Sequence, residues 1–600
     1  MCGIGGWFGA IEAGDSAAML AALRHRGPDG EGVWQRADGG ACLVHARLAI
    51  LDPSNAGAQP MGHIARAGWS AGQGIDPDEP SQSWLILNGE IYNFRELRSR
   101  LDADATTFAG ESDTEVLLRL LVMEGKSVLP KLAGMFALAW HDCESGRGLL
   151  ARDAFGIKPL YYAHFPGGVA FASEVRTLTP LLADASLDPG ALRDTLMWGS
   201  VPEPATMFRG IRALPAGCIL EWDGTAAKVT RWHHVTFGDG VAPSDPVAAT
   251  RAALFESVVR HLISDVPVGC FLSGGIDSSA ILALARQSLG AEADLRTFSV
   301  GFDDPAYDES AIARRTANHF GAVHTEWRMT ASEGRAEIAA YLAAMDQPTI
   351  DGFNTWCVSK LARREGLKVV LSGLGGDELF AGYGSFRQVP SFMRLHAMLG
   401  PLRPVAASAL YRTAAGSRWR RLAAFLRGPG TALAAFHVQR GIFTETEAAE
   451  LVRGNTGVTP DAADWVIDEV PADARDAVSY LELTRYMRNQ LLRDSDVFSM
   501  AHGLELRVPF VDSRLFETLA AIPASMRLRT GKQLLLEAVP EIPAWVREQP
   551  KRGFRFPFQE WMTGEFGELL KVADEKSTVP LVSWYRRWAL AAVLLKSGLA

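Results

Sequence analysis

The stretch VPVGCFLSGGIDSSAILALARQSLG, residues 266–290, decides the fold of the C-terminal part of this chain. Its first seven residues form the apolar run of a buried strand. Ile281, Ala285 and Leu289 then fall on one face of a helix that ends at Gly290. Adjacent glycines permit a tight turn between strand and helix, where backbone N–H groups and serine hydroxyls can surround an anion. This context favours a phosphate-binding loop over an ordinary turn with an N-cap.

A second strand and loop repeat this arrangement further along the chain. LKVVL (367–371) leads into the glycine-rich SGLGGDE (372–378). Strands that alternate with helical patterns are typical of a parallel α/β sheet, whose strands end at one crevice where nucleotides bind. Asp277 and Asp377 lie in the two loops, so we expect them to hold Mg²⁺ on the phosphates of a nucleotide.

Length and composition indicate a multidomain protein, because 600 residues exceed what one hydrophobic core covers. The net charge of −9 argues against a nucleic-acid-binding surface along the whole chain. The longest apolar run, Trp588 to Leu595, is too short to span a membrane. A signal peptide would require basic residues near the start of the chain, and none precedes Arg24. Six cysteines without a CxxC pair indicate neither a disulfide framework nor a zinc site. We therefore expect a cytoplasmic enzyme.

The chain divides near a proline-punctuated polar region between about 200 and 250. We place one domain at 2–210, rich in short strands, and another at 245–600, which becomes mostly helical from about residue 385. In the first domain a helix is predicted behind Ser112, ending at Gly125. Residues 63–83 are rich in Gly, Ser, Pro and Asp, which predicts a surface loop.

The second residue of the chain is a cysteine, and Gly-Ile-Gly-Gly follows it. Removal of the initiator methionine would leave Cys2 with a free α-amine. Such an amine titrates at a pKa of about 7.7 to 8.0, so it can take the proton from its own thiol. Cys2 is therefore a candidate nucleophile.

Groups that suit an amino-acid substrate occur within the next 111 residues. Arg47 can hold an α-carboxylate by a bidentate pair, and Glu90 and Asp113 can hold an α-ammonium. The Asn88 side-chain amide and the Gly89 N–H can form an oxyanion hole. Each could instead be a surface ion pair or part of a hairpin turn. Together with the cysteine they favour an active site.

These motifs resemble the glutamine-dependent asparagine synthetase family, and the resemblance covers nearly the whole chain. The phosphate loop is itself similar to the SGGxDS loop of ATP pyrophosphatases. The resemblance is carried by MCGIGG (1–6), LRHRGPDG (23–30), HARLAI (45–50), NGEIYN (88–93), SDTE (112–115), RDAFGIKPLYY (152–162), FASE (171–174), FLSGGIDSS (271–279), SGLGGDELFAGY (372–383), ELRVPFVD (505–512) and PKRGFRFP (550–557).

The resemblance implies an α+β N-terminal-nucleophile αββα sandwich followed by an α/β parallel-sheet ATP pyrophosphatase domain. It implies that Cys2 hydrolyses glutamine and that ammonia crosses a tunnel to an acyl-adenylate made from aspartate with ATP and Mg²⁺. The products would be asparagine, glutamate, AMP and pyrophosphate. Lys532, in TGKQLLLEA, corresponds to a lysine that steadies the pyrophosphate. A homodimer is expected by analogy.

The resemblance also implies substrate contacts. Those to glutamine fall on Arg47, Leu48, Ala49, Ile50, Leu51, Asn88, Gly89, Glu90 and Asp113. Those to ATP fall on Leu272, Val300, Ser372 and Gly373, beside the loop residues Ser273, Gly274, Gly275, Asp277, Ser278 and Ser279.

One position departs from the family pattern. Asparagine synthetases typically carry SGEGSDE in the second loop, whereas this chain has Leu374 in place of the glutamate. Leucine cannot accept a proton or orient ammonia. Either another carboxylate, such as Glu378, substitutes for it, or the acceptor is not aspartate.

Alternatives to asparagine synthesis therefore stay open. Another carboxylate, such as a uronic acid of a polysaccharide or a natural-product precursor, could be amidated. An intramolecular amide-forming cyclase would need no ammonia, so the complete glutaminase motifs argue against it, and a non-catalytic binding protein would not require Cys2 and Lys532. Residues 379–444 carry nine arginines and no acidic residue. They form either solvated helix faces or a patch for an acidic substrate or partner.

Overall fold

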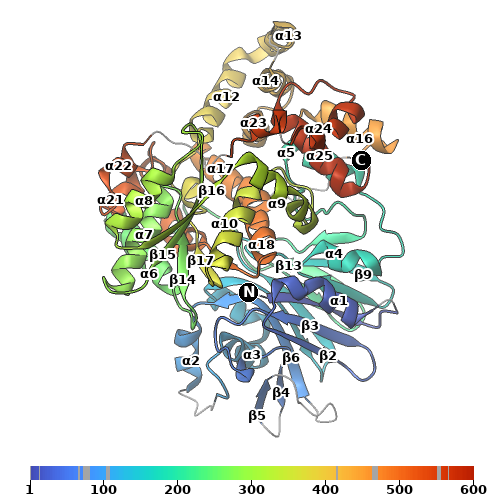
Figure 1. Cartoon of the computed structure of the whole chain (residues 1–600). Coiled ribbons are helices and arrows are strands. Elements are labelled where there is room, and N and C mark those ends of the chain that lie inside the picture. The colour runs from blue at the N-terminus through green and yellow to red at the C-terminus, as the bar shows by residue number, and fades with distance from the viewer. Residues whose placement is uncertain are drawn as a thin grey trace.

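The computed structural model describes residues 2–600 except 13, 65–67, 72–80, 103–107, 414–415, 462–469, 550–555 and 565. Figure 1 shows a strand-rich N-terminal part below an α/β and helical C-terminal part. Within the described residues, no helix is long and apolar enough to cross a membrane.

Two antiparallel sheets form the N-terminal part. Their strands are β1 (Cys2–Gly9), β2 (Gly30–Gln35), β3 (Ala41–Arg47), β4 (Met61–Ile64), β5 (Gly68–Ala71), β6 (Ser81–Ile91), β7 (Gly134–Asp142), β8 (Arg147–Arg152), β9 (Tyr161–Phe165), β10 (Gly168–Ala172), β11 (Ile211–Ala213), β12 (Cys218–Trp222) and β13 (Ala227–Arg231). The covering helices are α1 (Ser16–Leu23), α2 (Phe94–Asp102), α3 (Asp113–Glu124) and α4 (Val175–Leu178). The six-stranded sheet has the order β11-β9-β10-β1-β3-β2, and the seven-stranded sheet β13-β12-β8-β7-β6-β4-β5.

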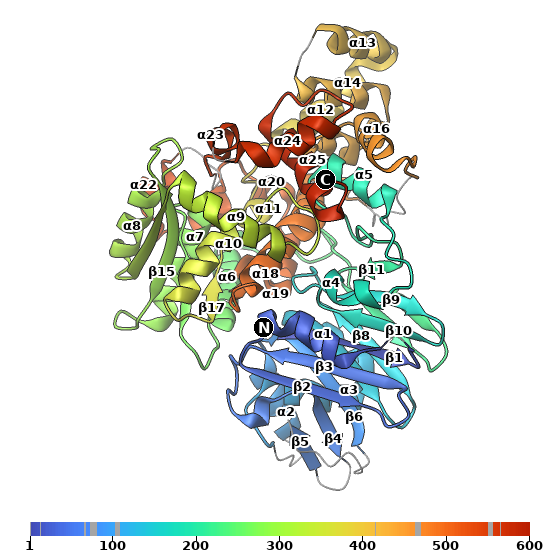
Figure 2. The same ribbon diagram turned by 45° about the vertical axis from the view of Figure 1, so that its right-hand side comes forward.

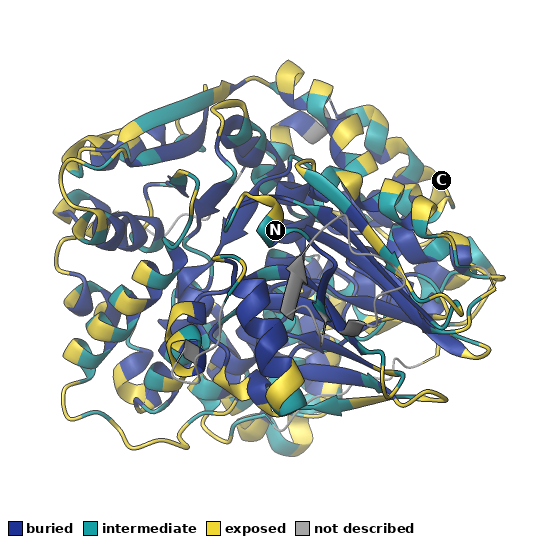
Figure 3. Cartoon of the chain, turned by 90° about the horizontal axis from the view of Figure 1, so that it is seen from below, coloured by how far each residue is buried: buried dark blue, intermediate teal, exposed yellow. Residues whose placement is uncertain are grey.

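Alternate residues of each strand face different layers, as the pleat of a strand requires. Phe8 and Ile86 pack between the two sheets. Their neighbours point outward, because Trp7 packs with residues of α1 and α4, and Leu85 packs with residues of α2 and α3. Helix, sheet, sheet and helix thus form four layers, which confirms the predicted N-terminal-nucleophile sandwich. Figure 3 shows the buried strands of this sandwich from below.

Two segments differ from the prediction for this part. Within 63–83, expected to be a loop, strands β4 and β5 pair with each other and extend the sheet beyond β6; residues 65–67 and 72–80 lie outside the described residues. Both sheets also continue past residue 210, where the sequence placed the end of the domain, because β11, β12 and β13 belong to them. The prolines of this region lie outside the strands, where no ladder hydrogen bond is lost.

The C-terminal part is built on a five-stranded parallel sheet with the order β16-β15-β14-β17-β18. Its strands are β14 (Val268–Phe271), β15 (Arg296–Phe302), β16 (Val323–Met329), β17 (Val369–Leu371) and β18 (Glu505–Arg507). Chain order reverses between the adjacent strands β14 and β17, the switch point at which open α/β sheets bind ligands. The parallel sheet and the mostly helical region after it confirm the predicted fold class.

The helices beyond residue 385 cover this sheet and project away from it. Helices α12 (Ser385–Leu399), α13 (Arg403–Thr413) and α14 (Ser417–Arg427) form a projection, with α13 at the edge of the molecule farthest from the N-terminal sheets in both views (Figures 1 and 2). A π-helical segment, Glu482–Leu492, runs directly into α18 (Arg493–Met500). Helix α18 packs on α10 (Phe353–Arg364) and β18.

Candidate active sites

Cys2 begins β1 and lies buried beside β6. Its backbone N–H donates to Oδ1 of Asn88 at 3.0 Å, while Nδ2 of Asn88 is buried with no hydrogen-bond partner. A buried amide donor without a partner is costly unless something binds to it. Burial raises the pKa of the Cys2 thiol, although Arg47 and the Leu48 backbone act in the opposite direction. The thiol therefore needs a base to become a nucleophile.

Gly89 can only be glycine in this strand. Its φ is +140°, and a Cβ there would lie 1.9 Å from the carbonyl oxygen of Met135 in β7. The absence of a side chain lets β6 carry Asn88 and Glu90 next to Cys2 without breaking its pairing with β7.

The expected glutamine-binding residues surround this cysteine. Arg47 pairs with Cys2 across the strands, and its guanidinium donates to the backbone carbonyls of Asp52 and Ser54, the latter at 2.8 Å. Asp113, the first residue of α3, accepts the Ile91 N–H at 2.8 Å. Leu48, Ala49 and Ile50 follow Arg47 and are buried, and Leu51 is half-buried.

Ser112 caps α3 by accepting the Glu115 N–H at 3.2 Å, and Gly125 ends the helix, which confirms the predicted helix. Burial raises the pKa of Asp113 to about 6. Burial also raises the pKa of Glu90 well above its usual range; Glu505 adds to this shift and Arg507 opposes it.

Sequence reasoning missed a buried arginine that ties Cys2 to the other domain. Arg26 is fully buried; its Nε donates to the Cys2 carbonyl at 3.2 Å, Nη1 to Glu174 at 3.0 Å and Nη2 to Asp496 of α18 at 2.6 Å. The motif LRHRGPDG contains Arg26, but nothing local indicates a partner 470 residues away.

Arg507, in β18, contacts both sites: its side chain lies at the first, and its backbone carbonyl lies at the second. Its Nη2 lies 3.6 Å from Glu90, and its Nη1 donates to the carbonyls of His261 and Ile263 at 2.7 and 2.6 Å. Its own carbonyl accepts the Ser372 N–H at 2.8 Å, at the start of the second glycine-rich loop. A displacement of Arg507 would therefore change contacts at both sites.

The two glycine-rich loops meet as the sequence predicts. The first joins β14 to α7 (Ile276–Leu289), and the second joins β17 to α11 (Gly376–Leu379). Asp277 and Asp377 lie in the first turns of these helices. Lys532, the N-cap residue of α21 (Gln533–Ala538), places its ammonium in contact with both carboxylates.

Lys532 is held in a conformation that its neighbours impose. It is almost fully buried and has a φ of +59°, which a non-glycine residue rarely adopts. Burial alone would lower the pKa of Lys532, but Asp277 and Asp377 together raise it. Three charges thus converge where the two loops meet, and the two carboxylates form a donor set that suits Mg²⁺.

Glycines let these loops interlock. A Cβ on Gly376 would lie 2.4 Å from Oδ1 of Asp277, and one on Gly382 would lie 1.8 Å from Oδ1 of Asp377. A Cβ on Gly373 would lie 2.8 Å from the Ser278 nitrogen. Glycines in the second loop and shortly after it therefore determine the positions of the Asp277 and Asp377 carboxylates.

The remaining expected ATP contacts lie around the same loops. Ser273 and Ser278 bring their hydroxyls within 3.3 Å of each other, and Gly274 adopts a φ of +72°. The Leu272 N–H donates to the Phe298 carbonyl of β15, the strand that also carries the buried Val300. Ser279 is fully buried behind the loop. Gly275, Ser372 and Gly373 complete the set.

Leu374 is half-buried and packs against the main core. Nearby in sequence, Glu378 is fully buried and accepts a hydrogen bond from the Tyr383 hydroxyl at 3.1 Å. Burial raises the pKa of Glu378 to about 8, with Asp377 and Glu482 adding to the shift. Glu378 is therefore mostly protonated at neutral pH.

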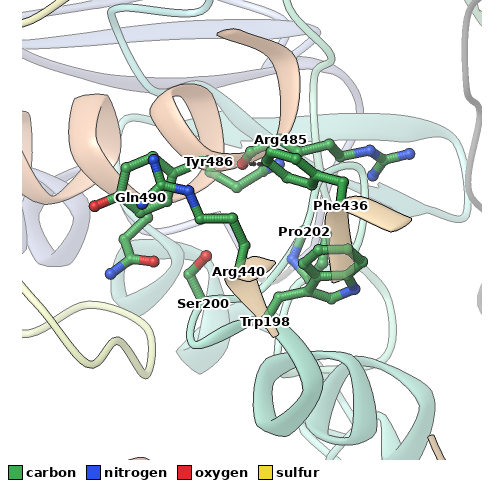
Figure 4. Close-up of a pocket in the computed structure, with 9 residues that line it drawn as sticks. Trp198, Ser200, Pro202, Phe436, Arg440, Arg485, Tyr486 and Gln490 are labelled. Atoms are coloured by element: carbon green, nitrogen blue, oxygen red, sulfur yellow. Dashed lines mark hydrogen bonds between the residues drawn. The ribbon is translucent and has the colours of Figure 1, made fainter. Parts of the chain in front are cut away.

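A narrow pocket of about 20 Å³ lies near this loop (Figure 4). The residues that line it include Trp198, Ser200, Pro202, Phe436, Arg440 and Tyr486. Arg440 stacks 4.2 Å from the Tyr383 ring and 3.8 Å from the Tyr486 ring. This volume holds about one water molecule.

Comparison with known proteins identifies both parts of the chain. The glutamine amidotransferase domain model matches residues 1–233, and the asparagine synthase model matches residues 249–598. The chain thus combines an amidotransferase domain with a synthetase domain. It belongs to the asparagine synthase family.

Named relatives extend over most of the chain. Asparagine synthetase [glutamine-hydrolyzing] 1 of Bacillus subtilis is 31% identical, over 96% of this chain and 90% of the relative. Asparagine synthetase B [glutamine-hydrolyzing] of Escherichia coli is 34% identical, over 66% of this chain and 67% of the relative. Amidase chyE of Penicillium rubens is 28% identical, over 92% and 86%.

Proposed function

We propose that this enzyme transfers the amide nitrogen of glutamine to an ATP-activated carboxylate, with aspartate as acceptor and asparagine as product. The observation that carries the proposal is the presence of two built sites in one chain. Cys2 lies beside the unpartnered amide of Asn88, and Asp277, Asp377 and Lys532 converge between two phosphate loops.

At the first site, the α-amine freed by removal of Met1 takes the thiol proton of Cys2, and the thiolate attacks the amide carbon of glutamine. Nδ2 of Asn88 and the Gly89 N–H stabilise the oxyanion. The protonated α-amine gives this proton to the departing nitrogen, ammonia leaves, and water hydrolyses the thioester to release glutamate. Arg47, Glu90 and Asp113 hold the α-carboxylate and α-ammonium of the substrate.

At the second site, the glycine-rich loops bind the phosphates of ATP through backbone N–H groups and the Ser273 and Ser278 hydroxyls. The acceptor carboxylate attacks the α-phosphorus and pyrophosphate leaves. Ammonia then attacks the acyl carbon and AMP leaves. Lys532 offsets the charge that develops on the pyrophosphate. Asp277 and Asp377 would hold Mg²⁺, which when bound neutralises phosphate charge.

One observation favours a second acceptor class. Leu374 provides no carboxylate at the position where asparagine synthetases carry one, and the nearby Glu378 is fully buried and already accepts a hydrogen bond from Tyr383 through one of its two oxygens. A relative that matches almost the whole chain is named an amidase. Amidation of another carboxylate, such as a uronic acid of a polysaccharide or a natural-product precursor, is therefore the alternative.

The test is pyrophosphate release with glutamine and ATP present, measured across candidate carboxylates and beginning with aspartate. We expect release with aspartate, matched one-to-one by asparagine. If aspartate gives no pyrophosphate while glutamate still accumulates, the amidotransferase stands and the acceptor must be sought among other carboxylates. If neither glutamate nor pyrophosphate forms, the proposal is wrong.

A further inference from the structure

The projection formed by α12, α13 and α14, residues 385–427, carries an unusual charge for this protein. Residues 379–444 contain nine arginines and no aspartate or glutamate, whereas the whole chain has a net charge of −9. This segment is therefore basic, whereas the rest of the chain is acidic overall.

Only some of these arginines make hydrogen bonds or ion pairs that stabilise the fold. Arg421 is buried and donates to the carbonyls of Val438 and Ile442, Arg420 pairs with Glu447, and Arg440 pairs with Glu482. The exposed arginines make no ion pair with any residue that the structure describes. They are Arg387, Arg394, Arg412, Arg418 and Arg427.

Apolar side chains are exposed on the same projection. Leu395 and Met398 near the end of α12 are 36% and 85% exposed. Leu402, just before α13, and Val405, in its first turn, are 62% and 68% exposed. Leu395 and Met398 are three residues apart in α12 and lie on the same side of that helix, and Leu402 and Val405 follow directly after the chain turns at Gly400. We refer to these four side chains as the apolar edge. Tyr411 and Trp419 are exposed as well, so apolar and aromatic groups lie among the arginines.

The position of this surface is as distinctive as its composition. Helix α13 lies at the far end of the molecule from the N-terminal sheets in both ribbon views (Figures 1 and 2). Exposing an apolar edge to water costs free energy, and such edges commonly mark sites that bind another molecule or a membrane. Helical segments that expose both basic and apolar side chains can insert into the boundary between lipid headgroups and acyl chains.

We propose that this projection docks the protein onto an anionic lipid surface. The arginines attract the lipid phosphates, the apolar side chains enter the boundary between headgroups and acyl chains, and Trp419 and Tyr411 suit that boundary because each has a polar tip. A nucleic acid would satisfy the arginines but not the apolar edge. The acidic remainder of the molecule is repelled by the same surface, so the tip alone faces the membrane.

The test is co-sedimentation of the full-length protein with vesicles of phosphatidylcholine alone or mixed with phosphatidylglycerol, at low and high salt. We expect binding only to the anionic vesicles, weakened by salt. Arg394→Gln and Arg412→Gln should each lower the partition coefficient about fivefold. Met398→Glu and Leu402→Glu should each lower it about tenfold or more.

Matched controls separate this surface from a general effect of charge. Val241→Glu changes another apolar side chain, which is 94% exposed in the segment between the two domains, and Arg209→Gln removes an exposed arginine elsewhere. Both should bind vesicles as the parent does, and glutamine hydrolysis by every variant should equal that of the parent. Equal sedimentation with both kinds of vesicle, full binding by Leu402→Glu, or binding of RNA without vesicle binding would overturn the proposal.

Discussion

At the scale of single residues, Cys2 is the proposed nucleophile, and Asn88 lies beside it. We predict that Cys2→Ala abolishes glutamine-driven amide formation and leaves the reaction driven by added ammonium salt unchanged, because the second site has its own residues. Parallel assays with glutamine and with ammonium chloride measure this. Loss of both activities would show that Cys2 supports the fold or the synthetase site.

The proposed role of Asp113 predicts that glutamine binding depends on pH. The fold raises its pKa to about 6 through burial, so the carboxylate that would hold the α-ammonium is charged above pH 6 and neutral below it. We expect kcat/KM for glutamine hydrolysis to fall as pH drops through 6, because this ratio reports the free enzyme. Asp113→Asn should have a lower kcat/KM and lose that step. A step that persists in Asp113→Asn would assign it to another group.

The same carboxyl group affects stability with the opposite sign. Because its pKa is higher in the folded chain than the ordinary value of 3.8, its contribution is fully present below about pH 4 and is lost as pH rises toward 6. Asn resembles the protonated, uncharged form of Asp113, so Asp113→Asn should change the melting temperature least near pH 4 and raise it increasingly toward pH 7, where the parent buries a charged carboxylate. Scanning calorimetry at several pH values from 4 to 7 measures this.

At the scale of elements, the second loop sets the position of the first. A methyl group on Gly376 would meet Oδ1 of Asp277, so we predict that Gly376→Ala displaces that carboxylate. A displacement of about 1 Å costs roughly 100-fold in rate, which should appear in ATP-dependent AMP formation. Glutamine hydrolysis should be unaffected.

Gly384→Ala is the matched control for this loop. Gly384 has an ordinary φ of −63°, and a Cβ there meets only the flexible Gln388 side chain at 3.3 Å. It should retain AMP formation at the level of the parent. Equal losses in both variants would mean that the loop does not determine the position of Asp277.

At the scale of the whole molecule, Arg507 connects the sites through one strand. Arg507→Lys keeps the charge but cannot donate to His261, Ile263 and Glu505 together, so we expect a loss of about 2 kcal/mol of stability. We also expect more glutamate to form per pyrophosphate released, because Arg507 is the residue that contacts both sites and its loss would uncouple glutamine hydrolysis from the ATP-dependent reaction. An unchanged ratio in a destabilised variant would show that Arg507 is structural only.

Much of this molecule was predictable from local patterns. The parallel sheet, its two loops and the capped helix at Ser112 follow from strand runs, glycines and an N-cap. The strands from β11 to β13 were missed because they are short and prolines lie near them. The partners of Arg26 and Arg507 were missed because burial and long-range pairing leave no local signal in the sequence.

The proposed reaction requires that nitrogen from glutamine reaches an adenylated acceptor within one enzyme. The most direct test supplies ATP, Mg²⁺, aspartate and glutamine labelled with ¹⁵N in its amide, together with excess unlabelled ammonium. We predict asparagine that carries the label, formed in step with AMP. Asparagine labelled only to the fraction found in the free ammonium pool, or glutamate and AMP without any labelled amide, would contradict transfer between the two sites.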